Sequence, residues 1–117
     1  MASTVNPVKL ADIQYLATVA GSIYANPAST ETFIKSIILH NNDTVTRTAT
    51  LYNVPDNSGA VRTATVAHQF FRQDLVPNET IILEFMVGLS LSDTNDTIQG
   101  LASSASKITV QLLGGRG

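Results

Sequence analysis

The stretch that decides the fold runs from Phe33 to Val54. It consists of an apolar run, Phe33-Ile-Lys-Ser-Ile-Ile-Leu39, a polar break, His40-Asn-Asn-Asp-Thr44, and a threonine-rich segment, Arg47-Thr-Ala-Thr-Leu-Tyr-Asn-Val54. β-Branched and aromatic residues favour strands, whereas Asn and Asp tolerate the backbone angles of turns. The stretch therefore predicts a β-hairpin, in which a strand, a turn and a second strand follow one another.

The same pattern recurs along the rest of the chain. Residues 64–71, 79–87, 96–102 and 107–113 each combine apolar residues with polar neighbours, and Gly, Pro, Asn and Ser separate the segments. Residues 12–25 fit a strand or extended segment, with a short helix as the alternative. We expect the last two segments to pair as a hairpin across residues 103–106, with Ile108, Val110 and Leu112 facing inward.

This spacing predicts an all-β fold, an antiparallel β-sandwich of about seven to eight strands. Jelly-roll and immunoglobulin-like connectivities both remain open, because the pattern does not distinguish them. Residues 1–11 are small and polar and include Pro7, so we expect a mobile or extended N-terminal arm. We assign residues 1–30 to this arm and a first extended segment, and residues 31–117 to the β-sandwich domain.

The composition points to a protein that is partly covered by a partner. The 117 residues suit one domain, and 14% of them are charged against 44% hydrophobic, with no cysteine and a net charge of -2. Soluble proteins are typically about 25% charged, so we expect apolar surface to be buried by another subunit. The lysines and arginines are scattered, and no apolar segment is long enough to cross a bilayer. We expect neither nucleic acid nor membrane as a partner.

The polar residues indicate turns rather than catalysis. His40 and His68 lack the spacing of a metal-binding or catalytic pair. The segment 93–96 could begin a calcium loop, but Ile98 and Ser104 stand where an EF-hand needs glycine and glutamate, so we interpret it as a turn. The sequence contains neither a Gly-x-Ser-x-Gly elbow nor a glycine-rich phosphate loop. We therefore expect no enzyme activity, no cofactor and no metal ion.

Residues 31–40 are apolar on both faces of the predicted strand, which suggests that a second chain covers one face. Simple alternation places Ile34 and Ile38 on one face and Phe33, Ile37 and Leu39 on the other. The candidate interface residues, of which the last five are expected to be shared with the core, are Pro7, Leu10, Ile13, Tyr15, Ile34, Ile38, Tyr52, Phe70 and Phe71.

Three sequence motifs follow one another in a recognisable order. They are an Ile-x-x-Ile-x-x-x-Asn strand at residues 34–41, a Thr-x-Thr-Leu-Tyr-x-Val-Pro strand at residues 48–55, and Asn-Asp-Thr-Ile at residues 95–98. This order resembles that of small β-sandwich virion proteins of tailed bacteriophages, over residues 31–114. One departure is Asn95, where a glycine is usual in those proteins.

The resemblance implies a capsid decoration or cement protein, located in the virion and bound to the major capsid protein or another virion protein. We expect it to form a homo-oligomer, a trimer. A neck or tail component is one alternative. Another is a virion-displayed module that binds carbohydrate or the host surface, for which Tyr15, Tyr24 and Tyr52 would form the platform. A stand-alone bacterial β-sandwich remains if the resemblance is accidental.

Overall fold

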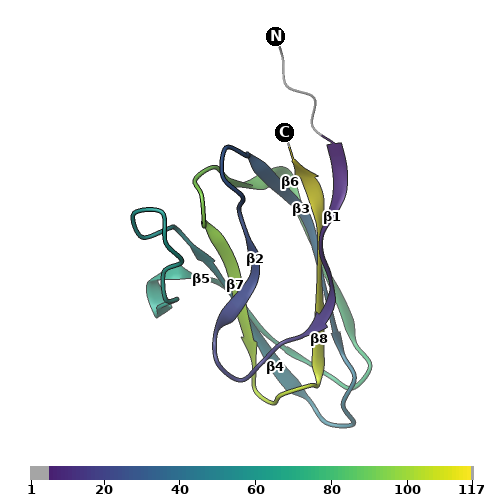
Figure 1. Cartoon of the computed structure of the whole chain (residues 1–117). Coiled ribbons are helices and arrows are strands. Elements are labelled where there is room, and N and C mark those ends of the chain that lie inside the picture. The colour runs from purple at the N-terminus through teal and green to yellow at the C-terminus, as the bar shows by residue number, and fades with distance from the viewer. Residues whose placement is uncertain (1–5, 117) are drawn as a thin grey trace.

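The computed structural model describes residues 6–116, without the side chains of residues 6–8 and 86–88. As the alternation predicts, the described chain is built of strands (Figure 1). They are β1 (Asn6–Tyr15), β2 (Gly21–Ala25), β3 (Thr32–Asn41), β4 (Arg47–Val54), β5 (Gln69–Leu75), β6 (Thr80–Leu91), β7 (Thr97–Ala102) and β8 (Ile108–Arg116). A single short 3-10 helix, η1 (Val66–His68), precedes β5 among these residues.

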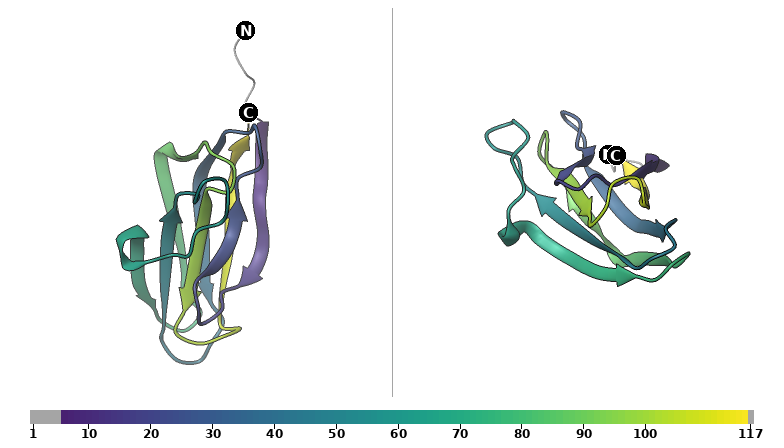
Figure 2. Two further views of the ribbon diagram at one scale, coloured as in Figure 1. Left: turned by 60° about the vertical axis from the view of Figure 1, so that its left-hand side comes forward. Right: turned by 90° about the horizontal axis from the view of Figure 1, so that it is seen from below.

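The strands form two antiparallel sheets that face each other as two layers (Figure 2). The first sheet has the order β1-β8-β3-β6, and the second has the order β2-β7-β4-β5. Between the described strands, each connection except β4–β5 crosses from one sheet to the other. The predicted antiparallel β-sandwich is thus confirmed, and its strand order is that of a jelly roll.

The core lies between the inner faces of the two sheets. Ile108, Val110 and Leu112 of β8 are fully buried, as their alternation along the strand predicts, and Ala49 of β4 is buried with them. Each large apolar side chain buried in this way stabilises the fold by roughly 1.5–3 kcal/mol. The inner faces therefore hold the molecule together, and the outer faces are left for other contacts.

The two predicted hairpins are absent from the described strands, because β3 and β8 belong to the first sheet and β4 and β7 to the second. The Asn-rich break after β3 spans the space between the sheets instead. The buried side-chain amide of Asn41 donates to the backbone oxygens of Val45, at 3.0 Å, and Leu75, at 2.9 Å. Its own oxygen accepts the backbone N–H of Asp43 at 2.9 Å. Asn41 thus joins the end of β3 to the opposite sheet.

A bulge decides which residues of β3 face the core. The regular pairing between β3 and β6 is interrupted just after Ile34, and extra residues at such a point change the side to which the chain points. As a result Ile34 shares the inner face with Ile37 and Leu39, and all three are fully buried. The expectation that Ile34 and Ile38 share one face was wrong for this reason.

The described sandwich begins well before residue 31. β1 pairs with β8 from Asn6 to Tyr15, and β2 pairs with β7. Residues 6–15 and 21–25 therefore belong to the two sheets, although we assigned them to an arm and a first extended segment. Pro7 fits into β1 because this strand lies at the edge of its sheet, where a missing backbone N–H is tolerated. Residues 1–5 of the expected arm lie outside the described residues.

Candidate functional site: the outer face of the first sheet

Three isoleucines line up across the outer face of the first sheet. Ile38 of β3 pairs with Ile82 of β6 on one side and with Gln111 of β8 on the other. The pairing of β1 with β8 is irregular here: Ala11 pairs with Leu112 and Gln14 with Val110, so Asp12 and Ile13 together lie opposite Gln111. Paired residues point to the same face of a sheet. Ile13 and Ile82 are 65% and 56% exposed, and we call Ile13, Ile38 and Ile82 the isoleucine row.

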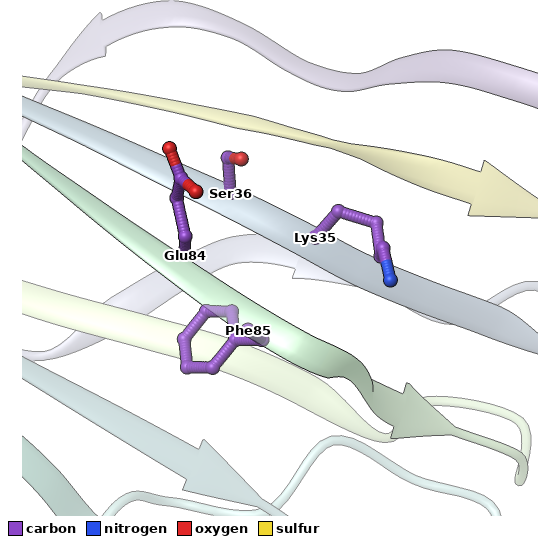
Figure 3. Close-up of a pocket in the computed structure, with 4 residues that line it drawn as sticks. All are labelled: Lys35, Ser36, Glu84 and Phe85. Atoms are coloured by element: carbon purple, nitrogen blue, oxygen red, sulfur yellow. The ribbon is translucent and has the colours of Figure 1, made fainter.

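A second row, nearer the other end of these strands, carries charge at both edges of the sheet. It runs from Lys9 of β1 through Leu113 and Ser36 to Glu84 of β6. Figure 3 shows the Ser36 and Glu84 side chains rising from the same side of the sheet, with the Phe85 ring on the other side. A hollow of about 410 Å³ lies here, lined by Lys35, Ser36, Glu84 and Phe85. The two edge strands thus present opposite charges at the same level.

Three of the predicted interface residues come together on this face. Ile13 and Ile38 belong to the isoleucine row, and Tyr15 lies beside it, because it pairs with Thr109 of β8 and is 54% exposed. Three strands separated in sequence contribute to the patch, so the sheet order and not the local sequence assembles it.

The remaining candidates do not join this patch. Ile34 is fully buried, and Leu10 and Phe71 pack against the core of the single chain. Tyr52 and Phe70 belong to the second sheet. The ring of Phe70 lies 6.4 Å from that of Phe85, so it closes the edge between β5 and β6. Pro7 lies in β1, and its side chain is outside the described residues.

Sequence reasoning missed Lys9, Ile82 and Glu84 as parts of one surface. Ile82 could have been found, since alternation along residues 79–87 puts it on the side opposite the inward-facing Ile81 and Leu83. An isoleucine on the outward side of a strand indicates a surface that another chain covers. The juxtaposition with Lys9 needs the register of all four strands, which is set by contacts far apart in the sequence.

Three carboxylates meet at one end of the second sheet. Ligand oxygens of Asp56, Asp93 and Asp96 lie within 4.8 Å of one another. Asp96 already accepts the backbone N–H groups of Asp56 at 2.9 Å, Asp93 at 3.0 Å and Ser92 at 3.3 Å. Partial burial acts to raise the pKa of Asp96, but these hydrogen bonds outweigh it and hold the pKa below its ordinary value. The contacts make Asp96 an anchor between two loops.

The three tyrosines of the expected sugar-binding platform are dispersed. Tyr15 lies on the outer face of the first sheet. Tyr24 packs against the core, and its hydroxyl is 3.1 Å from Oγ1 of Thr32. Tyr52 lies in the central part of the second sheet, where it pairs with Gln99. They do not form one aromatic surface.

Among the described residues, we find no helix with the length and apolar character needed to cross a membrane. No protein-family model matches the sequence, and no curated protein does either.

Two solved structures are similar to this chain. One is a chain from Bacillus endospore appendages, described as a novel family of disulfide-linked pili. It is 18% identical, with a TM-score of 0.53, and the match covers 97% of this chain and 87% of that one. The other is a chain from infectious bursal disease virus, Gt strain, which is 13% identical with a TM-score of 0.47. That match covers 97% of this chain and 32% of the viral chain. At 18% identity the likeness to the appendage chain concerns the fold alone.

Proposed function

We propose that this protein is a non-enzymatic structural component of a tailed-phage virion, a capsid decoration or cement protein that assembles with copies of itself and stabilises the head shell. The observation that carries self-assembly is the isoleucine row. Apolar surface left in water forgoes roughly 25 cal/mol per Å², and Ile13 and Ile82 are both more than half exposed. A covering subunit recovers that stabilisation.

The placement in a virion is supported by the order of strand motifs over residues 31–114, which resembles that of phage virion proteins. Jelly rolls recur among viral capsid and lectin domains. The Bacillus appendage protein is described as disulfide-linked. This chain contains no cysteine, so its assembly depends on complementary surfaces. Many copies on one shell add their modest contacts through multivalency.

Sedimentation velocity over a concentration series tests self-assembly. At about 100 µM a contact with a dissociation constant on the order of 10 µM is largely occupied, so we expect the wild type to be associated. Ile82→Glu places charge in the isoleucine row and should give monomers. Val66→Glu is the matched control, since Val66 is 83% exposed in η1 and lies outside the row. A monomeric wild type, or equal loss of association in both variants, contradicts the proposal.

Reconstitution tests the place in the particle. The purified protein is mixed with phage heads that lack it and, separately, with tails, and both samples are imaged by electron cryomicroscopy. Ordered density on heads supports the decoration role. Binding to tails alone overturns it in favour of the neck or tail alternative, and binding to neither refutes a virion role.

We also propose that residues 1–5 help to dock the protein on the head shell. Deletion of these residues tests this role and leaves β1 intact. We expect weaker binding to heads with an unchanged circular dichroism spectrum. Undiminished binding contradicts docking through these residues.

A further inference from the structure

We propose that the outer face of the first sheet packs against the same face of a second copy, about a twofold axis parallel to the strands. The inference rests on the proposed self-assembly and specifies its geometry. A twofold contact brings one patch against itself, so every contact occurs twice. Such a pair differs from the trimer that we expected from the sequence.

The order of the strands determines what meets across this axis. β1 and β6 are the two edges of the first sheet. A rotation of 180° about an axis parallel to the strands, passing between β8 and β3, lays β1 of each copy over β6 of the other. Residues in one row stay at the same level, because the rotation does not shift positions along the axis. Each row is therefore brought against itself in reverse order.

The charged row is complementary to itself under this rotation. Lys9 on β1 comes opposite Glu84 on β6 of the second copy, and Glu84 comes opposite the second Lys9. Within the chain Lys9 lies 2.6 Å from Asp12, but both side chains are more than half exposed, at 52% and 81%. An ion pair so exposed contributes little, so Lys9 remains available to Glu84 of another copy.

The isoleucine row fits the same rotation. Ile13 on β1 meets Ile82 on β6 of the second copy, and the two most exposed isoleucines of the face cover each other. Ile38 on β3 lies next to the axis and comes opposite Gln111 of the second copy, so the two copies of Ile38 are diagonal neighbours at the centre of the contact. Isoleucines thus dominate this row, and the charges of Lys9 and Glu84 lie at the rim, as is common in protein interfaces.

A twofold axis that is parallel to the sheet but perpendicular to its strands would give a different pair. It would lay each strand over its own copy, so Lys9 and Glu84 would remain on opposite sides of the contact. The opposite charges at the two edges therefore favour the parallel axis, since like charges across an interface are unfavourable.

The size of the face sets the expected strength. Four strands about 4.8 Å apart, with about seven residues of each, cover roughly 450 Å². A standard stable interface buries about 800 Å² on each partner. We therefore expect a weak pair that depends on concentration and, through its ionic rim, on salt.

Charge reversal tests the orientation. Lys9→Glu places like charges against Glu84 at two sites in the pair, and Glu84→Lys places like charges against Lys9. Each single variant should weaken association on the order of tenfold. An equimolar mixture of the two variants should restore it, because both contacts between unlike variants again join opposite charges. Sedimentation velocity at low salt measures the dissociation constants, and circular dichroism verifies that the variants fold.

Arg72→Glu serves as the control, since Arg72 is an exposed charge on β5 of the second sheet. Weakening in both single variants, recovery in the mixture and an unaffected control support the twofold pair. If the wild type associates but the single variants do so equally well, or the mixture does not recover, the orientation is wrong and self-assembly itself stands. If the wild type stays monomeric at every concentration, both the orientation and the proposed self-assembly fail.

Discussion

Replacing Asn41 with alanine removes the side chain that joins the end of β3 to the opposite sheet. Asn41 is fully buried and makes hydrogen bonds to Val45, Leu75 and Asp43. At about 1 kcal/mol net for each bond the loss is about 3 kcal/mol, and a buried carbonyl left without a donor raises it to roughly 4. For a domain of this size 1 kcal/mol corresponds to about 4 °C, so the Tm should fall by roughly 12–16 °C.

Urea titration followed by circular dichroism measures the free energy of unfolding of the Asn41→Ala variant. Asn42→Ala is the matched control, because Asn42 is exposed and its backbone N–H, which donates to Lys107 at 2.8 Å, is kept. The control should change stability by less than about 0.5 kcal/mol. Asn41→Asp keeps the shape but turns an acceptor toward the two carbonyls, so it should cost at least as much as alanine.

A loss of less than about 1 kcal/mol in Asn41→Ala, or an equal loss in Asn42→Ala, would contradict the role of the Asn41 side chain. The first outcome would show that the hydrogen bonds of Asn41 are readily replaced by water. The second would show that the loop tolerates substitution poorly for reasons unrelated to the buried amide.

Two further substitutions probe packing and charge. Gly114→Ala should lower the free energy of unfolding by about 3 kcal/mol or more in urea titration, because a Cβ there would overlap the carbonyl oxygen of Phe33. Gly21→Ala is the control and should be nearly neutral, since its Cβ would lie in open space. Equal effects of the two substitutions would contradict this. The pKa of Asp96 lies below its ordinary 3.8 in the folded protein, so its carboxylate contributes stability above about pH 4 that is lost as the pH falls through the folded pKa. Asp96→Asn should therefore lose less stability between pH 7 and pH 3 than the wild type does, and an equal loss would count against the role of Asp96.

Local sequence predicts most strands of this protein, because alternation along a strand depends on neighbouring residues alone. The strand expected at residues 64–71 was misplaced: residues 66–68 form η1, and β5 runs from Gln69 to Leu75. Ile108, Val110 and Leu112 are buried as expected. Strand pairing could not be predicted, since it depends on which distant strand lies alongside. The Asn-rich break after residue 40 has the composition of a tight turn. That it crosses to the other sheet instead is seen only in the structure, where the side chain of Asn41 donates to the backbone oxygen of Leu75 in that sheet.

The candidate surface was predicted only in part, because it too depends on how distant strands pair. Ile13, Tyr15 and Ile38 could be proposed from their apolar character, and the structure brings them to one face. Ile34 differs because a bulge, which leaves no mark in the alternation, turns it inward. The opposition of Lys9 and Glu84 becomes visible only when four strands are in register.

The central place of β8 in the first sheet has a consequence for synthesis. β8 lies between β1 and β3, although it is the last of the strands that the structure describes. Until residues 108–116 have left the ribosome, β1 and β3 lack the strand that joins them, and the first sheet cannot close. Incomplete chains of this kind expose unpaired edges and apolar surface, which makes them prone to aggregate. The first sheet therefore closes only after β8 has been translated, and until then the nascent chain is exposed to such aggregation.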